Sequence, residues 1–235
     1  MTTLAARIHE QAVDLPRSRP ATGRDALSAL FAVAHGVFDD LQRGARRGET
    51  PRGAFVGSVR GTGPGVSLSE IIAALERDHP IEPVFPFEGS RRVGGSAWRG
   101  SEIISRRSED AALKLEWLAG ADDLPMHTHA LSDRFIVVLR GRGYFHVSAE
   151  EPEHFSAGST RTLAVRERDV LAFTRGIVHT FSTAAEPMTL LSVHVPFIEL
   201  DDTNQYTLPR ERWEARHHLR PAASRVTAGR WHALL

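Results

Sequence analysis

The stretch Met126–Gly143, MHTHALSDRFIVVLRGRG, decides the fold. It places His127 and His129 two residues apart, ahead of an apolar run that ends in Gly141-Arg142-Gly143. On a strand, side chains two residues apart point to the same face, so these two imidazoles are close enough to share one metal ion. A His-x-His pair alone is often incidental, and the rest of the chain has to support the metal site.

Short apolar runs surround this stretch between Glu102 and Pro196, and Gly, Asp, Glu or Pro separates them. They are ALKLEWL, RFIVVLRG, GYFHV, TLAV, DVLAF, VHTF and MTLLSVHV. Many short strands with turn signals predict an all-β sandwich or barrel. One of the later runs offers His179 just after Gly176, with Asp169 upstream, and this third histidine raises the odds of a metal site.

The two motifs resemble those of the cupin superfamily. The first cupin motif has a glycine, a His-x-His pair and a closing glycine, and the second has an aspartate or glycine, a proline, a glycine and a histidine. The matching residues are Gly120, His127, His129 and Gly141, then Asp169, Gly176 and His179, with Thr174 where proline is usual. The resemblance implies a mainly β fold, a double-stranded β-helix (jelly-roll) barrel over residues 101–200.

One position departs from the cupin pattern. Where cupins often place a ligand glutamate this chain has Arg134, which stays protonated and cannot coordinate a metal. The resemblance then implies a three-histidine site on His127, His129 and His179. Asp133 is a candidate fourth ligand only if the strand bulges, because alternation turns it away from the face of residue 134.

Three neutral imidazoles leave a divalent ion with its full charge and with open positions, so the site favours an anionic ligand. Imidazole suits iron, zinc, nickel and copper, and manganese is a further candidate. Fe(II) is preferred on the resemblance alone.

A narrower resemblance is to the thiol dioxygenases, the cysteine dioxygenase-like cupins. These enzymes use three histidines and a Ser-x-His pair on the last barrel strand, which Ser192 and His194 match here. They also hold the substrate carboxylate with an arginine on an early strand, for which Arg99 is the nearest candidate. The tyrosine that completes their serine-histidine relay is missing.

Two side chains have open orientations at this stage. His194 either points into the barrel as a proton relay or points outward and bonds locally. Arg134, if it points inward, should meet an anionic substrate or a carboxylate such as Glu116, because an unpaired buried charge is costly. Otherwise it lies in water at the barrel mouth.

Other histidines and the C-terminal arginines have ordinary interpretations. His146 is expected to be a strand residue and His154 a loop residue, and neither is expected to bind metal, nor are His217 and His218. Scattered tryptophans are expected to pack the barrel wall.

Composition excludes several classes of protein. The 235 residues contain 29 Lys+Arg and 29 Asp+Glu, so the long-range attraction that nucleic-acid binders need is absent. There is no cysteine, so disulfides and thiolate ligands are excluded. No apolar run approaches the ~20 residues of a membrane helix, and we expect a cytoplasmic protein that binds neither nucleic acid nor membrane.

The chain outside the barrel divides into three parts. Residues 1–23 are expected to form a flexible arm, and residues 24–100 a helical and extended segment that packs on the barrel, with a linker at 44–66. Within that segment, residues 24–43 have the apolar spacing of an amphipathic helix, whose stripe needs the barrel or a second copy in a homodimer as partner. Residues 201–235 are expected to hold a short helix around Pro209 to Leu219 and a tail.

These observations predict a metal-dependent enzyme that acts on a small, carboxylate-bearing molecule, with Fe(II) dioxygenase chemistry as the leading form. A zinc or nickel isomerase, cyclase or lyase is the rival enzyme, in which the metal acts on a carbonyl and a base removes a proton. A non-catalytic cupin that binds a small ligand is the rival from another class, and Arg134 in place of glutamate favours it. A structural protein with a vestigial pocket ranks lowest.

Overall fold

The structure is a computed structural model that describes residues 28, 31–32, 34–39, 53–58, 98–104, 111–198, 202–215 and 232–233. The described strands are β1 (Ala54–Ser58), β2 (Trp98–Ile104), β3 (Ala111–Trp117), β4 (Thr128–His129), β5 (Asp133–Ser148), β6 (Arg161–Arg166), β7 (Asp169–Phe173), β8 (Val178–Ser182), β9 (Met188–Val195), β10 (Tyr206–Thr207) and β11 (His232–Ala233). Two short 3-10 turns, Ala157–Ser159 and Thr203–Gln205, lie between them. The prediction of a mainly β fold is confirmed.

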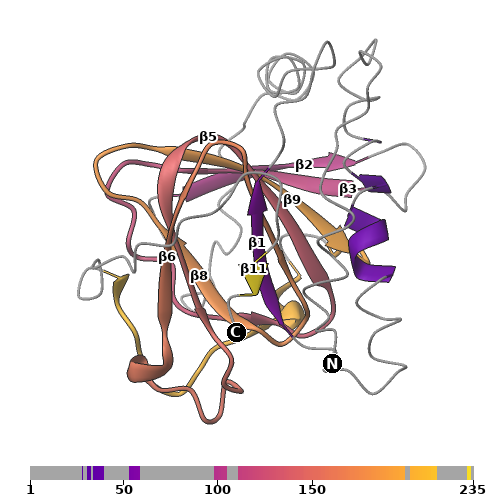
Figure 1. Ribbon diagram of the computed structural model, residues 1–235. Coiled ribbons are helices and arrows are strands. Elements are labelled where there is room, and N and C mark those ends of the chain that lie inside the picture. The colour runs from indigo at the N-terminus through magenta and orange to yellow at the C-terminus, as the bar shows by residue number, and fades with distance from the viewer. Residues whose placement is uncertain are drawn as a thin grey trace.

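The long strand β5 builds both walls of the barrel (Figure 1). Its first half pairs with β7 and β9, in a wall whose strand order is β11-β1-β7-β5-β9-β3-β2. Its second half pairs with β6 and β8. All of these pairings are antiparallel, so one bent strand joins two antiparallel walls around a common interior, as in the expected jelly roll.

Glycine is required where β5 crosses from one wall to the other. Gly141 has φ +76°, and a Cβ there would lie 2.0 Å from the carbonyl oxygen of Pro187. Gly120 and Gly176, the other two motif glycines, also have positive φ. The spacing of the two motifs therefore reflects backbone geometry as well as the positions of the histidines.

The interior is filled by alternate residues of both walls. Leu113 and Leu115 come from β3, Ile136 from β5, Leu190 from β9 and Phe181 from β8, and all are buried in one cluster. The outward-facing neighbours in the first half of β5, Phe135, Val137 and Leu139, are also buried, as are Leu191 and Val193 of β9. The barrel wall is therefore covered on its outer side as well.

Residues 31, 32 and 34–39 are helical, as the amphipathic spacing predicts. The apolar residues of its stripe that the structure describes, Phe31, Ala34, Val37 and Phe38, are buried within the single chain. The homodimer stays a prediction. The expected arm at residues 1–23 lies outside the described residues.

Two expectations about the flanking segments are wrong. Within the expected linker, Ala54–Ser58 forms β1 and pairs with β7 along its whole length. The expected helix from Pro209 is absent from the described residues 209–215, of which only Ala215 has a helical turn assignment. Trp213 and Ala215 are both buried with Met126, Phe155 and Val178, so burial there has the period of an extended chain and not of a helix.

His146 is a strand residue of β5, as expected. Its ring nitrogens bond Thr162 (2.9 Å) and Ser182 (2.7 Å), and its ring packs 4.6 Å from that of Trp213. His154 is exposed in a loop. No helix among the described residues is long and apolar enough to span a membrane.

Candidate metal centre

Three histidines meet between the two walls of the barrel. His127 and His179 exchange backbone hydrogen bonds, of 3.0 Å and 2.8 Å, which holds the chain before β4 against β8. Their ring centroids lie 4.6 Å apart, and the ring of His129 on β4 lies 5.0 Å and 5.1 Å from theirs. One nitrogen of each ring falls within 4.8 Å of the others. The three predicted ligands are therefore brought together.

The outward-facing nitrogens fix how each ring is protonated. The Nδ1–H of His127 donates to the carbonyl of Pro125 (2.9 Å), and that of His179 donates to the carbonyl of Ile177 (2.9 Å). The Nδ1–H of His129 donates to Oε1 of Gln205 (3.2 Å). With the proton on Nδ1, the lone pair of each Nε2 is free, which is the form that binds a metal.

Burial keeps all three imidazoles neutral. It lowers the pKa of His127 from 6.5 to about 4, with a smaller contribution from the charge of Arg134. The pKa values of His129 and His179 are lowered well below 6.5, again chiefly by burial. Neutral rings with fixed Nδ1 protons fit a divalent ion held through three Nε2 atoms.

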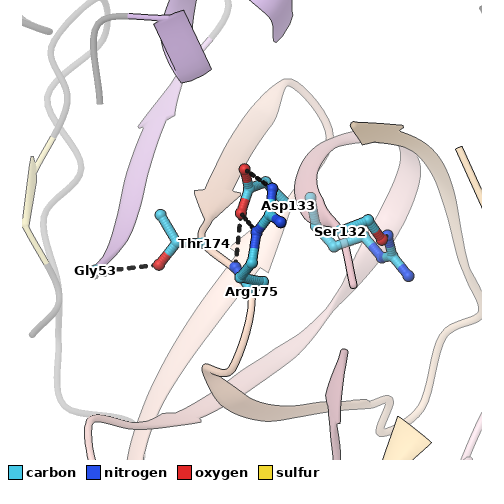
Figure 2. Close-up of polar contacts among 6 residues, drawn as sticks. Gly53, Ser132, Asp133, Thr174 and Arg175 are labelled. Atoms are coloured by element: carbon cyan, nitrogen blue, oxygen red, sulfur yellow. Dashed lines mark hydrogen bonds and ion pairs between the residues drawn. The ribbon is translucent and has the colours of Figure 1, made fainter. Parts of the chain in front are cut away.

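Asp133 is not placed as a fourth ligand. Its carboxylate accepts hydrogen bonds from the backbone N–H of Arg175 (2.7 Å) and from the Arg175 guanidinium (3.3 Å), as Figure 2 shows. The adjoining Thr174, which replaces the motif proline, accepts a bond from the N–H of Gly53 (3.0 Å) through its hydroxyl. Both residues therefore fasten the turn between β7 and β8.

Arg134 points inward and is 2% exposed. Its guanidinium donates to the hydroxyl of Ser132 and to Oε1 of Gln205 (2.7 Å), which are neutral groups. Burial lowers the pKa of Arg134 from 12.5 to about 9, so it remains charged at neutral pH. The expected pairing with Glu116 is not found, because Glu116 alternates with the cavity-lining Leu115 on β3 and is not part of the lining.

His194 also points into the barrel, which decides between its two open orientations. It stands opposite Arg134 in the pairing of β5 with β9, and Ser192 stands opposite Ile136 in the next inward row. The Nδ1–H of His194 donates to the carbonyl of Ile198 (3.3 Å), and burial lowers the pKa of His194 well below 6.5. Both His194 and Ser192 line the cavity, and their catalytic roles stay predictions.

Gln205 and Tyr206 complete the site and escaped the sequence analysis. The short strand β10 pairs with β4, which sets Tyr206 opposite His129 and brings its ring within 5.0 Å of that imidazole. Gln205 is fully buried, and its Oε1 receives bonds from both His129 and Arg134. A tyrosine is thus present in the cavity, although it comes from the C-terminal segment.

Arg99 lies on β2, opposite Glu116 in the pairing with β3. Its side chain is outside the described part of the structure. Its assignment to the substrate carboxylate stays a prediction.

The histidines lie in the lining of a cavity that is partly open to solvent. Its polar lining residues are His127, His129, Arg134, His179, Ser192, His194 and Tyr206. The rest is apolar, from Leu113, Leu115, Trp117, Leu124, Ile136, Phe173 and Phe181. None of these described lining residues is a carboxylate.

The bent β5 strand, the two antiparallel walls and the enclosed three-histidine group agree with the resemblance to the cupin superfamily. No protein-family model and no curated protein sequence matches the chain.

Solved structures that resemble it include oxalate decarboxylases. One is a formate complex of the Lactobacillus farciminis enzyme, with 19% identity, a TM-score of 0.38, and coverage of 51% of this chain and 32% of that one. Another is a Bacillus subtilis structure from a study of the Mn(II) centres of that enzyme, with 19% identity, a TM-score of 0.36, and coverage of 48% and 27%. The chain therefore spans about a third or less of the length of these proteins.

Proposed function

We propose that the chain is a metal-dependent enzyme that acts on a small anionic molecule, with Fe(II) dioxygenase chemistry as its leading form. The observation that carries the proposal is the charge balance of the cavity. Three neutral imidazoles converge there beside the buried Arg134, and the described lining contains no carboxylate. With a divalent ion bound, the cavity would hold three positive charges, which an anionic ligand would offset.

Arg134 is suited to bind the anion. Two of its five N–H donors are used by Ser132 and Gln205, which leaves donors for a ligand. In a buried site a guanidinium–carboxylate bond is strong because little solvent competes with it. Arg134 would therefore orient the substrate beside the three histidines.

A divalent metal bound here would supply open coordination positions for substrate and dioxygen. His194 would accept or return a proton through Nε2, since its Nδ1–H is occupied by the carbonyl of Ile198. Ser192 lies one row further in on the same strand face. This pair is the part of the site that resembles the thiol dioxygenases, and it supports the oxygenase form.

A second candidate is a zinc- or nickel-dependent lyase or isomerase. The same His194 favours it, because its Nδ1–H is held by the carbonyl of Ile198 and its Nε2 could take a proton from a substrate without oxygen. In this scheme Arg134 again binds the substrate anion.

Oxygen dependence separates the two candidates. The purified protein would be stripped with a chelator, loaded with Fe(II) or Zn(II) under nitrogen, and tested against thiol carboxylates and other small carboxylates with an oxygen electrode. Uptake of oxygen by the iron form, lost in Arg134→Met, is the expected result. Turnover without oxygen in the zinc form would transfer the proposal to the lyase or isomerase. Tight carboxylate binding with no turnover in either form would contradict an enzyme and leave a ligand-binding protein.

A further inference from the structure

The rows of side chains along the cavity change from charged to apolar. In the outermost row Arg134 on β5 pairs with His194 on β9 and with Phe173 on β7. In the next row Ser192 on β9 stands between Ile136 and Leu113. Beyond it the strand β3 contributes Leu115 and Trp117 to the lining. One end of the cavity therefore holds the charge of Arg134, and the other end is apolar apart from the indole of Trp117.

The apolar end is long enough to accommodate a substantial part of a ligand. Leu113 and Trp117 are four positions apart on β3, which is a rise of about 13 Å along a strand. Leu124 and Phe181 line the same region. None of the described lining residues beyond the Ser192 row has a polar group except the indole of Trp117. A second charged group on a ligand would be buried there without a partner.

We infer, on the basis of the proposed function, that the substrate is a monocarboxylate with an extended apolar body, whose carboxylate binds Arg134 and whose body lies against Leu113, Leu115 and Trp117. Arg134 is the one arginine or lysine of the described lining, and no described residue at the apolar end could neutralise a second anionic group there. The neutral oxygens of Ser132 and Gln205 hold the guanidinium in place without neutralising it. The site therefore selects against dicarboxylates and against short polar acids.

Calorimetry with two matched series of carboxylate probes tests whether the ligand is an apolar monocarboxylate. The Zn(II)-loaded protein would be titrated with butyrate, hexanoate and octanoate, and with succinate, adipate and suberate as the doubly charged counterparts. Burial of each methylene predicts about a fourfold gain in affinity until the apolar end is filled. Each dicarboxylate should bind at least tenfold more weakly than the monocarboxylate of equal length, and Arg134→Met should weaken the whole monocarboxylate series.

A variant that fills the apolar end provides the control. Leu115→Phe should lower the affinity for octanoate and leave that for butyrate unchanged, with thermal unfolding as the check on folding. Affinity that does not depend on chain length, or dicarboxylates that bind as well as monocarboxylates, would overturn the inference. Zinc content is measured in the same samples. If the protein binds no zinc but its affinity for monocarboxylates still rises with chain length, the proposed metal enzyme is contradicted and the inferred class of ligand is not.

Discussion

Arg134→Met should stabilise the fold while it removes anion binding. Arg134 is 2% exposed and its hydrogen-bond partners Ser132 and Gln205 are neutral. The nearby charge of Asp133 offsets only part of the cost of burying the guanidinium, because the pKa of Arg134 is still lowered. Methionine is unbranched and of similar length, and it suits the apolar neighbours Ile136 and Phe173. A buried charge that serves to bind a ligand is expected to lower the free energy of unfolding of the ligand-free protein, because the fold itself does not use that charge.

The magnitude follows from the pKa of the guanidinium. A pKa lowered from 12.5 to about 9 corresponds to about 5 kcal/mol of lost stabilisation of the charged form on folding. The unfolded chain binds this proton more tightly, so the full penalty is present below pH 9 and falls as the pH rises from 9 to 12.5. In Arg134→Met the buried oxygens of Ser132 and Gln205 lose the guanidinium as their hydrogen-bond donor. This loss reduces the stabilisation by about 1 to 3 kcal/mol. The net expectation is a stabilisation of about 2 to 4 kcal/mol at pH 7.5.

Urea unfolding of the chelator-treated protein at pH 7.5, followed by circular dichroism, measures this difference. The control is Arg175→Met, the same change at a half-exposed arginine whose ion pair with Asp133 is worth about 1 kcal/mol at most. Arg175→Met should be neutral or slightly destabilising. If Arg134→Met lowers the free energy of unfolding by 1 kcal/mol or more, Arg134 is a structural residue and the reasoning is refuted.

Three further outcomes follow from the site and the strand geometry. Because the pKa values of the four buried cavity histidines are lowered, the unfolded chain binds protons that the folded chain does not, and stability of the metal-free protein should fall by about 4 kcal/mol between pH 6.5 and 5.5. Gln205→Glu should place a carboxylate against Arg134 and weaken carboxylate binding at least tenfold in calorimetry, with metal content retained. Gly141→Ala should destabilise the fold by about 2 kcal/mol or more in thermal unfolding, through its positive φ and its contact with Pro187.

For each of these three predictions, one result would contradict it. A pH-independent stability over that interval would mean that the histidines are solvated. Loss of metal and of carboxylate binding together in Gln205→Glu would make Gln205 a packing residue. Gly158→Ala, at a glycine where an added Cβ meets nothing within 4 Å, is the control for Gly141→Ala and should be close to neutral.

The barrel and its three histidines were predictable because short strand runs are visible in the local sequence and because the two histidine motifs resemble those of the cupins. Alternation makes strands of the runs around His127 and His179, and the two motifs fix where the glycines bend the chain. Alternation also turns Asp133 away from the face of Arg134, as expected, and the carboxylate bonds Arg175 instead.

The parts that failed depend on contacts distant in the sequence. The strand β1 is five residues between glycine-rich flanks, and its pairing with β7 makes it a strand. Gln205 and Tyr206 belong to a short segment without periodicity, and only the pairing of β10 with β4 brings them to the site. Of the expected helix around Pro209 to Leu219, the described residues 209–215 are not helical, and Trp213 there packs against His146 of the barrel.

The central claim is that one divalent ion is held by His127, His129 and His179, and metal content per chain tests it most directly. The protein would be purified without chelators or a metal-binding tag, and Fe, Zn, Ni, Mn and Cu quantified for the wild type, for His127→Ala/His179→Ala, and for His154→Ala as an exposed-histidine control. The account predicts close to one ion per chain in the wild type and in the control, and its loss in the double variant. A wild-type protein that holds no metal even after reconstitution, or a double variant that retains it, would contradict the account.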